Sequence, residues 1–289
     1  MGKIHMVAAI RRLGQLAFVI GIVTSASLVG LTASAYPQAV EKIPSSPLVH
    51  VDKGEMPIII SAPHGGTKEV PGVSPRKGEG LQTGGSGFFA ARDSGTEELA
   101  NAIAHAVARR SGKKPYLVVA LFHRKYIDAN RPPEIAYEDD KAKPTYEAFR
   151  QTLASYCREV KKIYGSGLLL DVHGQDRMKE HVIRGTKDGK TVGFLVHRFG
   201  EKAHTGPESF FGLLAGNGCK VFPENLSDKE YSALNGGNIV QTYGSENYGI
   251  DAMQLEFGSS FREKGNISAT ADKVATAIDK FTKLYLAQR

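Results

Sequence analysis

The chain has 289 residues, 41% of them hydrophobic, with 32 glycines. This composition is that of an ordinary globular protein with one large domain or two small ones, and it excludes a fibrous or low-complexity chain. The formal net charge is +7, but basic and acidic residues are mixed, as in "REVKK" at 158–162, which argues against the concentrated basic surface of a nucleic-acid-binding protein.

The N-terminus has the pattern of a secretory signal peptide. Lys3, Arg11 and Arg12 precede an apolar stretch at 16–32, and "ASA" at 33–35 offers small residues for cleavage after Ala35. We therefore predict a signal peptide at 1–35 and a periplasmic or secreted protein with no stable membrane association. The alternative is an N-terminal membrane anchor, because the apolar stretch approaches the ~20 residues that a bilayer requires. Cleavage would leave 34 basic against 30 acidic residues, a net charge of +4.

A linker containing proline and serine at 36–47 precedes the predicted catalytic domain at 48–289. Apolar runs predict strands, and longer segments with an apolar residue every three or four positions predict helices. The predicted strands are 47–52, 57–62, 115–121, 167–172, 191–196, 219–222 and 251–257. The predicted helices are 94–111, 145–163, 207–216 and 267–287. This alternation predicts a single-domain α/β fold, a mixed, mostly parallel sheet with helices on both faces.

The chain has two cysteines, Cys157 and Cys219. In an exported protein they can form a disulfide, whereas the apolar helical face around Cys157 equally favours two buried thiols. The sequence contains neither a CxxC motif nor a cluster of cysteine with histidine. This excludes a cysteine-based metal site.

Polar residues fall where several predicted strands end. The strand at 57–62 leads into "SAPHGG", which contains His64, and the strand at 167–172 leads into "DVHG", which contains Asp171 and His173. In α/β folds, functional sites gather at the carboxyl ends of strands. A strand that ends in Asp-x-His offers an imidazole together with a carboxylate that can orient a histidine.

Two further carboxylates belong to the same predicted edge of the sheet. Asp93 directly precedes the helix at 94–111, and Glu256 lies near the end of the strand at 251–257, on the same side as Gln254. Catalytic zinc commonly takes three ligands from histidine and Asp or Glu, and keeps a fourth position for water. The grouping is therefore typical of a metal hydrolase, with Glu256 as the candidate general base.

Other common catalytic motifs are absent from the sequence. No serine has glycine at both −2 and +2, which excludes the nucleophile elbow of an α/β-hydrolase. "GTKDGKT" at 185–191 has three residues between its glycines where a phosphate-binding P-loop requires four.

The segment "HRKYIDANR" at 123–131 contains two arginines, Arg124 and Arg131. Considered alone, each is more typical of a surface salt bridge.

Six segments in their order resemble the N-formylglutamate amidohydrolase family, which is related to zinc carboxypeptidases and aspartoacylase-like deacylases. They are "SAPHGG", "RDSGTEELA", "HRKYIDANR", "LLLDVHG", "NGGNIVQTYG" and "MQLEFG". The resemblance covers about 57–257 and implies the phosphorylase/hydrolase-like α/β fold of zinc carboxypeptidases. It implies one Zn²⁺ per chain, bound by His64, Asp93 and His173, with Glu97 as the alternative acidic ligand.

The same resemblance implies roles for four further residues. Glu256 matches the general base, and Asn130 with Arg131 looks like the pair that holds the substrate carboxylate in the carboxypeptidase relatives. An arginine can bind a carboxylate through two parallel hydrogen bonds, and a neighbouring asparagine adds a donor. Arg124 would then polarise the scissile carbonyl and stabilise the oxyanion.

Two features depart from the family. N-formylglutamate arises in the cytoplasm, so export argues for another substrate, such as a peptide, an acylated amino acid or a cell-wall fragment. The glycine-rich insertion at 65–89 is expected either to close over the substrate or to be a surface loop without a catalytic part.

The leading hypothesis is therefore an exported zinc-dependent amidohydrolase that acts on a small-molecule or peptide substrate bearing a carboxylate. One alternative is a non-catalytic exported ligand-binding protein of the same fold. Another is a metal-independent hydrolase with Asp171 or Asp93 as its nucleophile.

Overall fold

The computed structural model describes residues 44–83, 87–244 and 248–287. The predicted signal peptide, and the predicted linker up to residue 43, lie outside these residues, so cleavage after Ala35 and the membrane-anchor alternative stay predictions. Across the described ranges, no helix is both long and apolar enough to cross a membrane.

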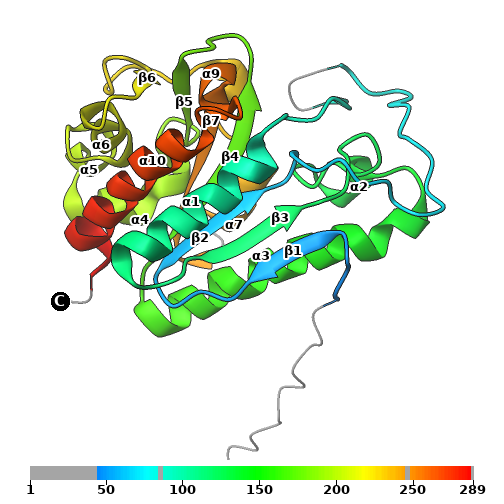
Figure 1. Ribbon diagram of the computed structural model, residues 1–289, viewed down its shortest axis with the longest axis horizontal. Coiled ribbons are helices and arrows are strands. Elements are labelled where there is room, and N and C mark those ends of the chain that lie inside the picture. The colour runs from blue at the N-terminus through cyan, green and yellow to red at the C-terminus, as the bar shows by residue number, and fades with distance from the viewer. Residues whose placement is uncertain (1–43, 84–86, 245–247, 288–289) are drawn as a thin grey trace, which may run out of the picture. The chain divides into compact units, whose positions relative to one another are not determined.

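Seven strands form one mixed sheet in the order β1-β3-β2-β4-β7-β5-β6 (Figure 1). β1 runs antiparallel to β3 and β5 antiparallel to β7, whereas the other neighbours are parallel. This confirms the mixed, mostly parallel sheet. The strands are β1 (Val49–Asp52), β2 (Ile58–Ala62), β3 (Tyr116–Ala120), β4 (Leu168–Gln175), β5 (His181–Gly185), β6 (Lys220–Phe222) and β7 (Asp251–Gly258).

Helices cover both faces of this sheet, as predicted. α1 (Thr96–Ser111) and α10 (Ile267–Phe281) pack together on one face, with α4 (Gly193–Phe199), α5 (Lys202–Thr205) and α6 (Phe210–Gly216) beside them. α3 (Lys143–Tyr164) and α7 (Asn238–Tyr243) cover the other face. The short elements are α2 (Pro133–Ala136), α9 (Ser259–Arg262), the 3₁₀ helices η1 (Asp140–Ala142), η2 (Lys190–Val192) and η3 (Ser232–Leu234), and the π-helix η4 (Thr282–Leu286).

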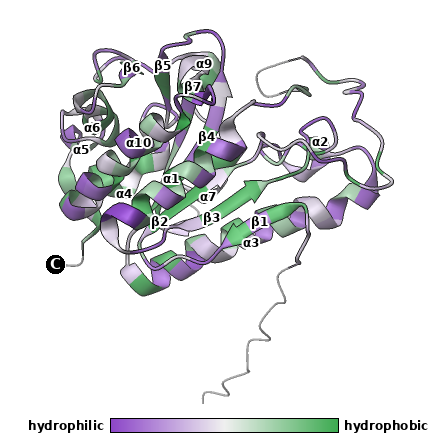
Figure 2. Ribbon diagram, in the orientation of Figure 1, coloured by the Kyte–Doolittle hydropathy of each residue, from purple (hydrophilic) through white to green (hydrophobic). Residues whose placement is uncertain are grey.

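The two faces of the sheet have separate hydrophobic cores. Ile58 and Ile60 belong to the core beneath α1 and α10, whereas Ile59 belongs to the core beneath α3. Because successive side chains of a strand point to opposite faces, a strand covered on both sides is apolar at every position. Figure 2 shows the central strands as hydrophobic ribbons between helices of mixed hydropathy.

One predicted strand is wrong. Residues 191–196 lie in η2 and α4. The strand that precedes them, β5, is not among the predicted strands. Val192 and Leu195 are buried in the core, and Val196 and Phe199 pack against it. These positions follow the three- and four-residue spacing of a helix rather than the alternation of a strand. The predicted helix at 207–216 begins only at Phe210. The short helices α2, α4, α5, α7 and α9 have no counterpart among the predicted helices.

Both cysteines are buried free thiols. Cys157 lies in α3, and Cys219 lies immediately before β6. Burial raises the pKa of both thiols, and a thiol with a raised pKa is a poor nucleophile. The structure therefore favours the buried-thiol alternative over the disulfide.

Candidate metal centre and active site

Two glycines place His64 at the end of β2. A Cβ atom on Gly65 would lie 2.3 Å from the amide nitrogen of Glu97, and a Cβ atom on Gly66 would lie 2.3 Å from the carbonyl carbon of Leu121. Glycine at 65 therefore lets the first turn of α1 approach, and glycine at 66 lets the segment after β3 approach. The Asp93 amide donates a hydrogen bond of 3.0 Å to the carbonyl of His64. The turn thus brings His64 beside Asp93.

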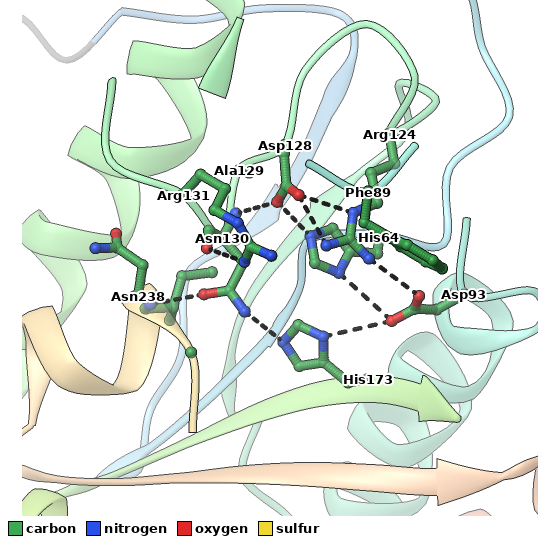
Figure 3. Close-up of polar contacts among 12 residues, drawn as sticks. His64, Phe89, Asp93, Arg124, Asp128, Ala129, Asn130, Arg131, His173 and Asn238 are labelled. Carbon is green, nitrogen blue, oxygen red and sulfur yellow. Dashed lines mark hydrogen bonds and ion pairs between the residues drawn. The ribbon is translucent and has the colours of Figure 1, made fainter. Parts of the chain in front are cut away.

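Three buried side chains converge at one point, as Figure 3 shows. The Nδ1 atoms of His64 and His173 each lie 3.4 Å from Oδ2 of Asp93. Two ligands about 2.1 Å from a tetrahedral ion would lie about 3.4 Å apart. Nδ1 of His64 is buried and has no hydrogen-bond partner among the described residues. The geometry and the orphaned nitrogen together fit a metal ion bound by His64, Asp93 and His173.

Each histidine is oriented by a second carboxylate through its other ring nitrogen. Nε2 of His64 lies 2.7 Å from Oδ1 of Asp128, and Nε2 of His173 lies 2.7 Å from Oδ2 of Asp171. An ionised carboxylate only accepts hydrogen bonds, so each Nε2 carries a proton, and in the neutral ring Nδ1 then presents its lone pair to the convergence point. The sequence pattern predicts Asp171 for this task, whereas no motif in the sequence indicates a role for Asp128.

The charges of the cluster favour a cation at its centre. Burial raises the pKa of Asp93, but its close contacts with His173 and His64, together with the positive charge of Arg124, outweigh burial and hold this pKa well below the usual value of a carboxyl. Burial lowers the pKa of His173, but the charge and hydrogen bond of Asp171 and the bond to Asp93 raise it well above the usual value of histidine. The carboxylates that stabilise a proton on this ring stabilise a metal cation at the same point.

Arg124 is buried between two of these carboxylates. Its Nε donates to Oδ2 of Asp128 at 2.9 Å, its Nη2 lies 2.7 Å from the same oxygen, and its Nη1 lies 3.6 Å from Oδ1 of Asp93. Its guanidinium also lies over the ring of Phe89, 4.9 Å from the ring centre. Arg124 therefore belongs to the cluster and not to a surface salt bridge.

Glu256 lies beside the cluster on the neighbouring strand. In the β4–β7 ladder Glu256 is directly opposite His173, and its Oε1 accepts a hydrogen bond of 2.7 Å from Nε2 of Gln254. Burial raises the pKa of the Glu256 carboxyl to about 7, the positive charge of His173 opposes this rise, and the negative charge of Asp93 adds to it. A carboxyl with a pKa near 7 is suited to general acid-base chemistry.

Asn130 and Arg131 also face this region. Oδ1 of Asn130 accepts a hydrogen bond of 2.7 Å from the amide of Ile239, and its Nδ2 lies 3.3 Å from Nε2 of His173. Arg131 donates from Nε to the carbonyl of Gly87 at 3.0 Å, and from Nη1 to the carbonyl of Asn130 at 3.1 Å. Both residues are thus fixed by the backbone around them.

One cavity of about 1180 Å³ is lined by the proposed ligands and by the polar side chains around them, namely His64, Asp93, Arg124, Asn130, Arg131, His173 and Glu256. Asp128 and Asp171 are not among its lining residues. Glu97, the alternative acidic ligand, is not among the lining residues and lies outside the cluster. The structure therefore brings Asp93, and not Glu97, together with the two histidines.

The glycine-rich insertion forms part of the cavity wall. Nη2 of the buried Arg76 donates to the carbonyl of Phe89 at 3.0 Å and to the carbonyl of Arg124 at 2.9 Å. The first bond lies within the insertion, the second attaches the insertion to the segment after β3, and Phe89 lines the cavity. In its described part, the insertion therefore helps to shape the site.

Asp171 is unsuited to act as a nucleophile. It is completely buried, and it accepts hydrogen bonds from Ser61 Oγ at 2.5 Å and from His173 at 2.7 Å. It is also not among the residues that line the cavity. These contacts argue against the metal-independent alternative in the form that uses Asp171.

Two solved structures are similar to this arrangement of strands and helices. The crystal structure of N-formylglutamate amidohydrolase from Ralstonia eutropha JMP134 aligns with a TM-score of 0.52 and 13% identity, over 82% of this chain and 98% of that chain. A gene product of Agrobacterium tumefaciens aligns with a TM-score of 0.53 and 15% identity, over 82% of this chain and 95% of that chain. The chain shares their fold. No protein-family model and no curated protein matches the sequence.

Proposed function

We propose that the protein is an exported, zinc-dependent amidohydrolase that cleaves an amide bond near a carboxylate of its substrate. The observation that carries this proposal is the convergence of Nδ1 of His64 and Nδ1 of His173 on Oδ2 of Asp93, each at 3.4 Å. This is the spacing of ligands around one tetrahedral zinc ion. The fold shared with an amidohydrolase structure supports the same proposal.

The side chains around the centre have the chemistry that amide hydrolysis needs. Zn²⁺ bound there would supply Lewis acidity, which acidifies water and polarises a carbonyl. Glu256 would accept the proton of the attacking water and deliver it to the leaving amine nitrogen. Arg124 would stabilise the negative charge that develops on the carbonyl oxygen. The products would be a carboxylic acid and an amine.

The proposed substrate is a small molecule or peptide with a free carboxylate. Arg131 lines the cavity, and its guanidinium can bind a carboxylate through two parallel hydrogen bonds, with Asn130 beside it. The signal-peptide pattern at the N-terminus supports a substrate in the periplasm or outside the cell. The mixed distribution of charge argues against a nucleic-acid partner.

The first test compares metal content and turnover in three proteins. We expect near-stoichiometric zinc in the wild type and in His105→Ala, a control that replaces an exposed histidine of α1, and none in His64→Ala. Chelation should abolish hydrolysis of N-formyl and N-acyl amino acids and peptides, and zinc should restore it. Turnover that survives complete metal removal, or a wild-type protein that takes up no zinc, would contradict the proposal.

The proposed carboxylate site is tested with matched substrates. Each active substrate is compared with its primary amide in the wild type and in Arg131→Met. Loss of a charged hydrogen bond predicts a fall in kcat/KM of roughly 10- to 100-fold for the free acid and a much smaller fall for the amide. Equal losses for acid and amide would show that Arg131 does not recognise the carboxylate.

A further inference from the structure

We propose that Arg262 is a positioning residue that holds three parts of the active site in one arrangement. The proposal rests on the function proposed above. Arg262 is the last residue of α9, which directly follows β7. Its side chain is buried with 6% exposed.

The guanidinium of Arg262 joins the backbone of three separate elements. Nε donates to the carbonyl of Phe257 at 2.9 Å, Nη2 donates to the carbonyl of Gln175 at 3.1 Å, and Nη1 donates to the carbonyl of Ser94. These acceptors belong to the end of β7, the end of β4 and the segment that leads into α1.

Each acceptor lies within two residues of a residue of the proposed chemistry. Phe257 directly follows Glu256, and Ser94 directly follows Asp93. Gln175 is the second residue after His173. One side chain therefore connects the backbones that present the general base and two of the three metal ligands.

Arginine is suited to this task by its shape. Its planar guanidinium presents five donors in fixed directions, so it can serve several acceptors at once. Lysine concentrates its donors on one nitrogen atom and cannot span three separated carbonyls in the same way. An apolar replacement would leave these carbonyls without their donors.

The glycines around Arg262 are an independent sign of close fit. A Cβ atom on Gly174 would lie 2.6 Å from Cζ of Arg262. A Cβ atom on Gly95 would lie 2.5 Å from the carbonyl oxygen of Arg262. Gly174 follows His173 and Gly95 follows Ser94, so the two segments that carry metal ligands approach Arg262 at glycine positions.

The ion pair of Arg262 is a separate and weaker contact. Nη2 lies 2.9 Å from Oδ1 of Asp176, whose side chain is 77% exposed. Exposed ion pairs contribute little to structure. Asp176→Asn therefore removes the ion pair and keeps the three carbonyl contacts.

The test measures zinc affinity and local hydrogen exchange in Arg262→Met and Arg262→Lys. Misplacement of Asp93 and His173 should weaken zinc binding by about 10- to 100-fold in the methionine variant, the range seen when the partners of metal ligands are removed. We expect faster exchange in segments 93–98 and 172–177. The lysine variant should lose zinc affinity as well, and it carries the test if the methionine variant does not fold.

Two controls separate positioning from a general loss of stability. Arg184→Met removes another buried arginine, which is paired with Glu230 at 2.9 Å and is not among the residues lining the cavity. Arg184→Met should lower the free energy of unfolding and leave zinc affinity unchanged, and Asp176→Asn should leave zinc affinity unchanged.

The outcomes distinguish this inference from the proposed function. Unchanged zinc affinity and exchange in the Arg262 variants would overturn the positioning role. The positioning role would also be overturned if Asp176→Asn lost as much zinc affinity as Arg262→Met, because loss of the ion pair would then explain the weaker zinc binding. A wild-type protein that binds no zinc would refute the proposed function, and local exchange alone would then decide the role of Arg262.

Discussion

Nε2 of His64 lies 2.7 Å from Oδ1 of Asp128, and this contact turns Nδ1 of the same ring toward Asp93. His173 repeats the arrangement with Asp171. In both rings the nitrogen closer to the backbone faces the convergence point. The outer carboxylates therefore select the tautomer that a metal ligand needs.

Replacing an outer carboxylate should weaken zinc binding without removing a ligand. For Asp128→Asn and Asp171→Asn we expect zinc affinity to fall about 10- to 100-fold, because an amide no longer enforces the proton on Nε2. Titration calorimetry or a competing chelator measures this. Asp52→Asn is the matched control, since Asp52 contacts the exposed His50 at 3.1 Å outside the site. Affinity equal to wild type in both buried variants would refute the orienting role.

Glu256→Gln should separate metal binding from turnover. The amide keeps the size of the side chain but cannot accept the proton of water, so kcat should fall by about 10²- to 10⁴-fold while zinc content stays the same. Glu263→Gln is the control. It makes the same change in an exposed glutamate that also lines the cavity, and it should not cause this fall in kcat. A fully active Glu256→Gln variant would exclude Glu256 as the general base.

Gly65→Ala should destabilise the protein and weaken zinc binding. The new methyl group would lie 2.3 Å from the backbone of α1 at Glu97, so His64 or the helix must move. We expect a loss of about 1 to 3 kcal/mol in the free energy of unfolding, as for other overpacked sites. Gly216→Ala in α6 meets no atom within 4 Å and should be neutral or slightly stabilising. Equal free energies of unfolding for the two variants, measured with urea, would contradict the close approach of Gly65 to α1.

Because of His204, the free energy of unfolding should decrease as the pH is lowered below neutrality. Burial, aided by the charge of Arg184, lowers its pKa from 6.5 to about 4, and its Nε2 lies 3.0 Å from Oγ1 of Thr186. The unfolded chain therefore takes up a proton at a higher pH than the folded protein, and stability is lost as the pH falls from 6.5 towards 4.

Urea unfolding at pH 7.5 and 4.5 measures this dependence. The contribution of His204 should be about 2 to 3 kcal/mol. His204→Gln should lose that part of the dependence, whereas the exposed His197→Gln should keep it. The same pH dependence in His204→Gln and wild type would show that other groups cause it.

The central strands can be predicted from the sequence because they are covered on both faces and are therefore apolar at every position. Ile58, Ile59 and Ile60 divide between two cores, so their run is apolar throughout and easily recognised. The same reasoning fails at 191–196, where a short apolar run belongs to a helix. Over six residues, the alternation of a strand and the spacing of a helical face cannot be told apart.

The candidate site is predictable where a side chain lies at or just after the carboxyl end of a strand. His64, His173 and Glu256 follow this rule, because His64 comes after β2 and the other two lie near the ends of β4 and β7, and Asp93 precedes a helix. Asp128 does not, because its contact with His64 depends on how the segment after β3 folds back towards β2. The role proposed for Arg262 cannot be predicted from the sequence, because its partners are backbone carbonyls, which every residue has.

The cavity of about 1180 Å³ exceeds the roughly 300–1,000 Å³ of ordinary small-ligand pockets. A single acylated amino acid would therefore contact only part of its wall. Contacts made far from the scissile bond can be used to lower the activation barrier, so a shortened substrate loses kcat as well as affinity. Longer substrates should accordingly be turned over faster, and slow cleavage of a minimal amide would reflect unused wall contacts rather than a defective centre.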